Sequence, residues 1–144
     1  MNEYGRYLWV RSYQKDSANT WKGCRMVKFS MGTPKTIVTL CRGYTPDNIM
    51  VQKWSYDGNL LWASMNAFSS ILIPTSSFGL DIDSDESIYY TAKYTDTSNI
   101  EHIAYFKLNS NGNSLAWVIQ GGSSSFFGGL VAVSGGYVHF GGLN

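Results

Sequence analysis

One short phrase occurs three times in the sequence and constrains the fold more than any other feature. It reads YGRYLWV at residues 4–10, YDGNLLWA at 56–63 and SNGNSLAWV at 110–118. The tryptophans of the three copies, Trp9, Trp62 and Trp117, are 53 and 55 residues apart. Periods of this length are typical of solenoids and propellers, in which each repeat packs against its neighbours. We therefore expect the three tryptophans to occupy equivalent packing positions between neighbouring sheets.

Short alternating segments, rather than helical stripes, fill the rest of the chain. Gly or Ser interrupts every candidate helix, whereas segments rich in β-branched and aromatic residues lie between turn formers. Asp57-Gly58 and Asn111-Gly112 are dipeptides that tolerate positive φ at both central positions of a tight hairpin turn. The sequence therefore predicts an all-β, antiparallel fold in a single domain, residues 1–144.

The repeat divides into units of four predicted strands. In the better-defined unit the strands are residues 79–83, 87–94, 102–109 and 114–120. In the preceding unit they are residues 24–30, 36–42, 49–56 and 60–65. We therefore place the repeat units at approximately 24–66 and 79–120, with partial units at 4–13 and 128–143.

The better-defined unit carries a family motif. It reads GLDIDSDESIYYTAKYTDTSNIEHIAYFKLNSNGNSLAWVIQGG over residues 79–122 and resembles the bacterial β-propeller repeat family. Residues 24–66 match more loosely, since their first strand lacks the family's Asp. Within residues 79–122, Asp85-Glu86 stands where the family usually has Gly. The resemblance implies four-stranded, blade-like sheets of the β-propeller type, and it implies no single activity.

The number of repeats is too small to close a ring. About two blades plus extra terminal strands are present, whereas propellers ordinarily have about 4–8 blades. Three explanations remain open: a piece of a longer propeller, association with further copies, or a small β-sandwich or barrel that uses a blade-like motif. Exposed edge strands favour association, so we expect a homo-oligomer or assembly with other structural proteins of a larger particle.

Charge and composition exclude several classes of function. Formal net charge is +1 and the basic residues are scattered, so nucleic acid is not an expected partner. The N-terminus lacks the features of a secretory signal and no apolar segment is long enough to span a membrane, so we expect a soluble protein without membrane insertion. His102 and His139 are the only histidines and no G-x-S-x-G motif occurs, so we expect neither an enzyme nor a cofactor.

The expected function is therefore that of a non-enzymatic structural or binding protein that assembles and presents a recognition surface. A phage virion, as a tail or capsid-associated component, is one setting that fits the composition. The alternative is a lectin-like, glycan-binding propeller assembled from several subunits. Aromatic residues outside the repeat phase are the ligand or interface candidates: Tyr13, Trp21, Tyr44, Trp54 and Tyr94.

The two cysteines, Cys24 and Cys41, lack the spacing of a zinc site. Pairing outward from a turn at residues 31–34 places residues whose numbers sum to 65 opposite each other, and these two are among them. Buried thiols and a cross-strand disulfide are both compatible with this pairing. The absence of an export signal favours the thiols.

Three acids, Asp81, Asp83 and Asp85, form a D-x-D-x-D run that resembles a calcium loop. The run lacks a Gly after its third Asp, and Ala92 stands where the bidentate carboxylate would be required. We therefore expect no metal site, and solvated acids on the exposed face of a strand.

Overall fold

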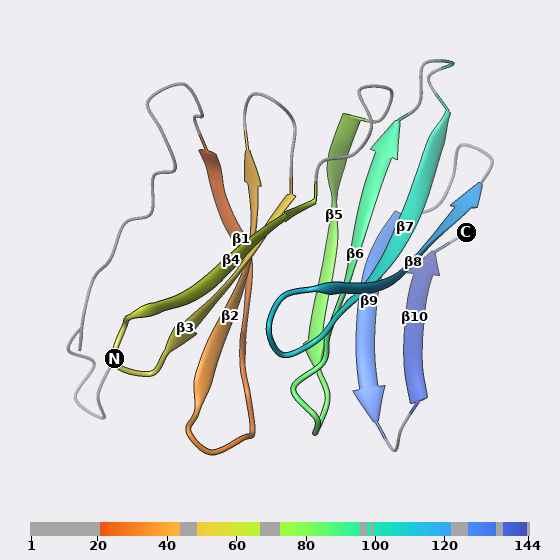
Figure 1. The fold of residues 1–144 in the computed structure, drawn as a ribbon. Coiled ribbons are helices and arrows are strands. Elements are labelled where there is room, and N and C mark those ends of the chain that lie inside the picture. Colours follow the sequence, from red (N-terminus) through yellow and green to blue (C-terminus); the bar gives the residue numbers. More distant parts are fainter. Residues whose placement is uncertain are drawn as a thin grey trace.

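The computed structural model describes residues 21–43, 49–66, 73–95, 98, 100–121, 127–134 and 137–143 (Figure 1). The first sheet comprises β1 (Trp21–Phe29), β2 (Thr36–Gly43), β3 (Ile49–Ser55) and β4 (Leu60–Asn66). The second comprises β5 (Ile73–Ile82), β6 (Ile88–Thr95), β7 (Glu101–Leu108) and β8 (Ser114–Gly121), and the third β9 (Phe127–Ser134) and β10 (Tyr137–Leu143). These described residues contain no helix and every strand pair is antiparallel, which confirms the predicted all-β fold.

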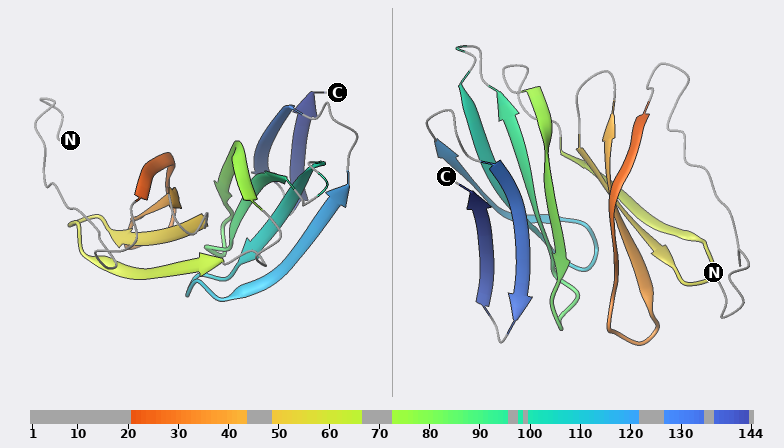
Figure 2. Two further views of the ribbon diagram at one scale, coloured as in Figure 1. Left: turned by 90° about the horizontal axis from the view of Figure 1, so that it is seen from above. Right: turned by 180° about the vertical axis from the view of Figure 1, so that it is seen from behind.

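Within each four-stranded sheet the spatial order of the strands is their order in the chain. The first strands of successive sheets are neighbours, because β5 contacts β1 on one side and β9 on the other. Seen from above, the sheets follow one another along an arc, with β1, β5 and β9 on one side and β4 and β8 on the other (Figure 2). No helix long and apolar enough to cross a membrane occurs in the described parts of the chain.

The hydrophobic core lies between the first two sheets. The first sheet contributes Val38, Leu40, Ile49 and Val51 to this core. The second contributes Leu80, Ile88, Tyr90, Ala92, Ala104, Phe106 and Leu108, and the rings of Tyr90 and Phe106 stack with centroids 4.6 Å apart. Successive strand residues point to opposite faces, and β3 is buried on both of them.

The β3–β4 and β7–β8 turns differ from the predicted form. Gly58 and Gly112 have φ of +85° and +83°, but the residues before them, Asp57 and Asn111, do not have positive φ. Gly112 N–H donates to Asn109 O at 2.9 Å, as Gly58 N–H donates to Ser55 O at 3.0 Å. Each connection is a β-turn followed by a single left-handed glycine, so only one of the two dipeptide positions needs positive φ.

The last two strands of each four-stranded sheet, β3–β4 and β7–β8, correspond at an offset of 54 residues, which relates Lys53 to Lys107 and Gly58 to Gly112. Lys53 pairs with Trp62, whereas Lys107 pairs with Ala116. Trp117 is one position further along its strand, because the second copy has one more residue between the turn glycine and the tryptophan. The expectation that Trp62 and Trp117 occupy equivalent positions is therefore wrong, and Trp9 lies outside the described residues.

A disulfide joins Cys24 of β1 to Cys41 of β2, with Cα atoms 3.8 Å apart. Cys24 is exposed, so the expectation of two buried thiols is wrong; that preference depended on the N-terminal sequence and not on geometry. The predicted register is also wrong by one residue beside the turn, where Phe29 faces Ile37. A bulge between Cys24 and Met26 shifts β1 by one residue, and this shift brings the two cysteines opposite each other.

Reduction of this disulfide is expected to lower the free energy of unfolding by about 2–3 kcal/mol, because it removes a closed loop from the unfolded chain. Denaturant unfolding with and without dithiothreitol measures the difference. A Cys24→Ser/Cys41→Ser variant is the control, since its stability should match that of the reduced protein and not respond to the reductant. Equal stability of the oxidised and reduced forms would contradict this expectation.

Asp81 of β5 connects the first strands of all three sheets. Its carboxylate lies 3.2 Å from Lys28 Nζ of β1, and it accepts a hydrogen bond of 2.7 Å from Val133 N–H of β9. Its side chain is 18% exposed. The expectation of a solvated acid is therefore wrong for Asp81, because the neighbouring strands approach β5 from both sides.

Candidate binding pocket between the first two sheets

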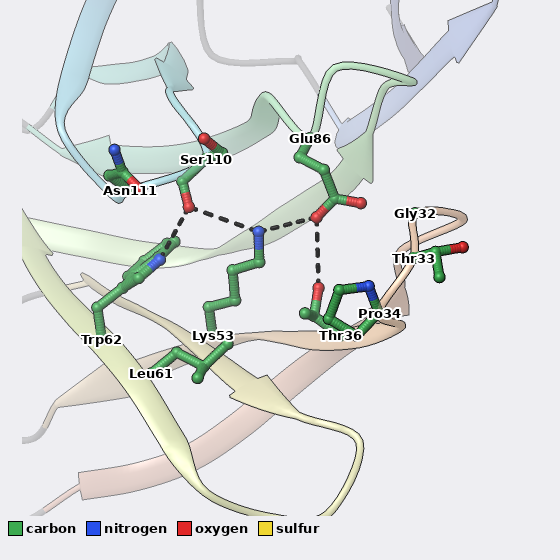
Figure 3. A pocket seen from close by; sticks show the side chains of 10 residues that line it. All are labelled: Gly32, Thr33, Pro34, Thr36, Lys53, Leu61, Trp62, Glu86, Ser110 and Asn111. Atoms are coloured by element: carbon green, nitrogen blue, oxygen red, sulfur yellow. Dashed lines mark hydrogen bonds and ion pairs between the residues drawn. The ribbon is translucent and has the colours of Figure 1, made fainter.

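A pocket of about 380 Å³ lies where the first sheet meets two turns of the second sheet. Its lining comes from the β1–β2 turn, from the facing strands β3 and β4, and from the β5–β6 and β7–β8 turns. Figure 3 shows Lys53 between Ser110 and Glu86, with Trp62 on one side and Thr36 and Pro34 on the other. Packing of the two sheets therefore brings together residues that are far apart in the sequence.

Lys53 provides a buried positive charge in this pocket. On β3 it follows Ile49 and Val51 at alternate positions, which places it on the face that forms the shared core. Its side chain is only 8% exposed, and its Nζ lies 2.8 Å from Glu86 Oε2 and donates to Ser110 O at 3.4 Å. A lysine buried to this extent needs a counter-ion, and the second sheet supplies it.

The β5–β6 turn presents Glu86 in an unusual backbone conformation. Glu86 has φ of +66°, a value that glycine adopts more readily than other residues. Glu86 N–H donates to Asp83 O at 3.1 Å, and the Asp83 side chain accepts a hydrogen bond of 2.9 Å from Ser87 N–H. The turn therefore holds a glutamate in a left-handed conformation, with its side chain in the pocket.

The surroundings of Glu86 stabilise its ionised form. Burial raises the pKa of the carboxyl, but hydrogen bonds from Lys53 and Ser30 outweigh burial and leave the pKa below its usual value of 4.5. Thr36 Oγ1 lies 3.4 Å from Glu86 Oε2, and Gly32 N–H also donates to the carboxylate. A Cβ at Gly32 would overlap Glu86 Oε1, so a larger residue there would displace the Glu86 carboxylate.

Trp62 of β4 lines the other end of the pocket and packs against the shared core. Its indole Nε1–H donates to Ser110 O at 2.9 Å. The ring lies against Gly112, where an added Cβ would be 2.7 Å from Cε3 and 2.9 Å from Cδ2. The left-handed glycine of the β7–β8 turn therefore makes room for the tryptophan of the neighbouring sheet.

Asp83 and Asp85, in the turn beside the pocket, interact with each other and with the backbone. Burial raises the pKa of Asp83, whereas a hydrogen bond with Asp83 lowers the pKa of Asp85 to about 2. Asp83 also accepts a hydrogen bond of 3.0 Å from the Tyr89 hydroxyl. Asp83 therefore stabilises the turn and is not a simple solvated acid. Within the described ranges, no three His, Cys, Asp or Glu side chains lie together as metal ligands would.

Of the predicted ligand-binding aromatics, only Trp54 has a described side chain, and it does not line this pocket. Trp54 is 8% exposed, so it does not contribute to an exposed aromatic patch; its neighbours Met50 and Gln52, at alternate positions of β3, are also buried. Trp21 and Tyr94 belong to β1 and β6, and their side chains, like that of Trp117, are outside what the structure describes. Tyr13 and Tyr44 lie outside the described residues.

Sequence reasoning missed Lys53, Glu86 and Ser110. The available signal was a lysine at an alternate position after Ile49 and Val51, since a charge in an apolar row predicts a buried partner. The partner itself could not be identified, because Glu86 is 33 positions away in another sheet.

No protein-family model, curated protein or solved structure matches the chain. The resemblance to the β-propeller repeat family therefore rests on the sequence motif alone.

Proposed function

We propose that the protein is a non-enzymatic β protein, built from blade-like repeats of the β-propeller type, that assembles with further copies of itself and presents a recognition surface. Such an assembly suits a structural component of a larger particle, such as a phage virion. Support comes from a difference in burial between corresponding faces of the first two sheets.

The register relates Val27 and Phe29 of β1 to Leu80 and Ile82 of β5. Leu80 is 1% exposed and Ile82 packs against the shared core, because the first sheet covers this face of the second. Val27 and Phe29 are 54% and 59% exposed. On β1 the first sheet therefore exposes apolar side chains on the face that the second sheet buries, whereas Met50, Gln52 and Trp54 on the same face of β3 are buried. The exposed side chains of β1 carry the proposal.

A second copy of the chain is the occupant that we assign to this face. The third sheet lies beside the second as the second lies beside the first. Within the described residues β10 pairs only with β9. Tyr137, at the start of β10, is 73% exposed. The third sheet of one copy can thus dock on the first sheet of the next, a head-to-tail contact that closes into a ring when the rotation allows it.

Light scattering coupled to size-exclusion chromatography tests the assembly. Propellers have about 4–8 blades, so two or three copies are expected. Phe29→Asp should dissociate the oligomer to monomers because it places a charge in the interface. Leu115→Asp, at a residue that is 55% exposed on β8, is the control and should leave the oligomer intact. A wild-type protein that stays monomeric at high micromolar concentration would exclude this proposal.

A further inference from the structure

We propose that the pocket between the first two sheets binds a neutral, hydroxyl-bearing ring such as a monosaccharide, either free or at the end of a glycan. The proposal is independent of self-assembly, because one chain supplies every residue of the pocket. It also differs from the aromatic surface expected from the sequence, since the described lining does not include Trp54, the one of those aromatics whose side chain is described.

The volume of the pocket sets the size of the ligand. About 380 Å³ is at the lower end of the range for small-molecule sites, and it accommodates a single sugar ring but not a folded protein segment.

The charge of the pocket favours a neutral ligand. Lys53 and Glu86 form an ion pair with an N–O distance of 2.8 Å, and the lowered pKa of Glu86 keeps its carboxylate ionised at neutral pH. Their charges cancel inside the pocket. A phosphate or carboxylate ligand would meet the Glu86 carboxylate as closely as the Lys53 ammonium, so an anion gains little there.

Hydrogen-bonding groups in the pocket match the hydroxyls of a sugar. The Lys53 ammonium has three N–H donors, and the described residues provide acceptors for two of them, Glu86 Oε2 and Ser110 O. The third N–H of Lys53 is the remaining donor. The Lys53 side chain is 92% buried in the wall of the pocket, and a ligand oxygen there can accept a hydrogen bond from this N–H. Asn111 adds an exposed amide group to the same lining.

Apolar surface occurs beside these polar groups. Leu61 is 52% exposed although it lines the pocket, and the half-buried indole of Trp62 lies next to it on β4. Across the pocket is the exposed ring of Pro34. A pyranose presents hydroxyls around its edge and C–H groups on its faces, so it can use both kinds of surface at once.

Leu61 and Leu115 provide a matched pair of variants for the test. Both are the extra residue of a bulge, at corresponding positions of β4 and β8, and they are 52% and 55% exposed. Only Leu61 lines the pocket. Replacing either exposed leucine with Asp should leave the fold intact, but only Leu61→Asp places a charge where the sugar would bind.

The probes are methyl glycosides of neutral hexoses and N-acetylhexosamines, titrated into labelled protein and followed by the indole N–H signal of Trp62 in ¹H–¹⁵N spectra. One neutral glycoside is expected to shift this signal saturably, and Leu61→Asp should weaken its binding by about tenfold or more. Leu115→Asp should bind like the wild type. A glycan array distinguishes a terminal sugar of a longer glycan from a free monosaccharide.

Three results would overturn the assignment. The first is that no neutral glycoside shifts the Trp62 signal and no neutral glycan on the array binds. The second is that Leu61→Asp and Leu115→Asp bind equally well. The third is that inorganic phosphate or sialic acid binds in preference to the neutral sugars, which would contradict the charge balance of Lys53 and Glu86.

Discussion

Replacing Lys53 with methionine is expected to lower the free energy of unfolding by about 3–5 kcal/mol. Methionine keeps most of the aliphatic volume of the lysine but removes the ammonium that lies 2.8 Å from Glu86 Oε2. The Glu86 side chain is only 22% exposed, so its carboxylate would remain largely buried without a counter-ion. Denaturant unfolding followed by tryptophan fluorescence measures the loss.

Lys107→Met is the matched control, since Lys107 occupies the corresponding position of the second sheet. Lys107 Nζ lies over the ring of Tyr89, 5.1 Å from its centroid, in a more open environment. Loss of this cation–π contact is expected to cost about 1 kcal/mol or less. Similar losses for the two variants would show that the Lys53–Glu86 pair has no special importance.

The pH dependence of stability provides an independent test of the same pair. The folded protein lowers the pKa of Glu86 below its ordinary value of 4.5, so the unfolded chain binds the proton more readily. The stabilisation is therefore present above the unfolded pKa and is lost as the pH falls through the lower, folded pKa. Glu86→Gln should destabilise the protein at neutral pH, and the difference from wild type should shrink towards acidic pH. A difference that stays constant with pH would contradict this account.

Replacing Gly112 with alanine is expected to cost about 2–5 kcal/mol, for two separate reasons. The backbone φ of +83° is unfavourable for any residue with a Cβ, which accounts for about 1–2 kcal/mol. The new Cβ would also lie 2.7 Å from Trp62 Cε3, and overpacking of this kind typically adds about 1–3 kcal/mol. Thermal or denaturant unfolding gives the total, and the near-ultraviolet circular dichroism reports displacement of the indole.

Gly23→Ala separates the two contributions. Gly23 has φ of +112°, but no heavy atom lies within 4 Å of the position that its Cβ would take. Its replacement should therefore show the cost of the backbone conformation without a clash. Equal losses for Gly23→Ala and Gly112→Ala would mean that the ring of Trp62 does not limit the space at Gly112.

The strands could be predicted from the sequence because alternation of side chains is a local property. The segments expected at 36–42 and 49–56, for example, become Thr36–Gly43 and Ile49–Ser55. Bulges are harder to predict, because one extra residue leaves the apolar pattern readable but changes the partner of every residue beyond it. The register error beside Phe29 begins at the β1–β2 turn, and the bulge between Cys24 and Met26 restores the predicted pairing at the cysteines. Trp62 and Trp117 differ for another reason, since the second copy has one more residue after its turn glycine.

The pocket could not be predicted, because its parts become neighbours only when two sheets pack together. Ser110 is 57 positions from Lys53, and it contributes a backbone carbonyl, which no residue type identifies. Glu86 looked like one of several acids in a polar turn. What distinguishes it is a left-handed backbone and a partner in another sheet, and neither is visible in a list of residues.

The carboxylate of Asp81 has a consequence for how the molecule unfolds. Arrays of repeats often lose their units one at a time, since each unit contacts only its neighbours. Here one side chain of the middle sheet bonds to Lys28 in the sheet before it and to the backbone of Val133 in the sheet after it. Fraying of either outer sheet must break a bond to the same buried group, so the three sheets are expected to melt in a single cooperative transition.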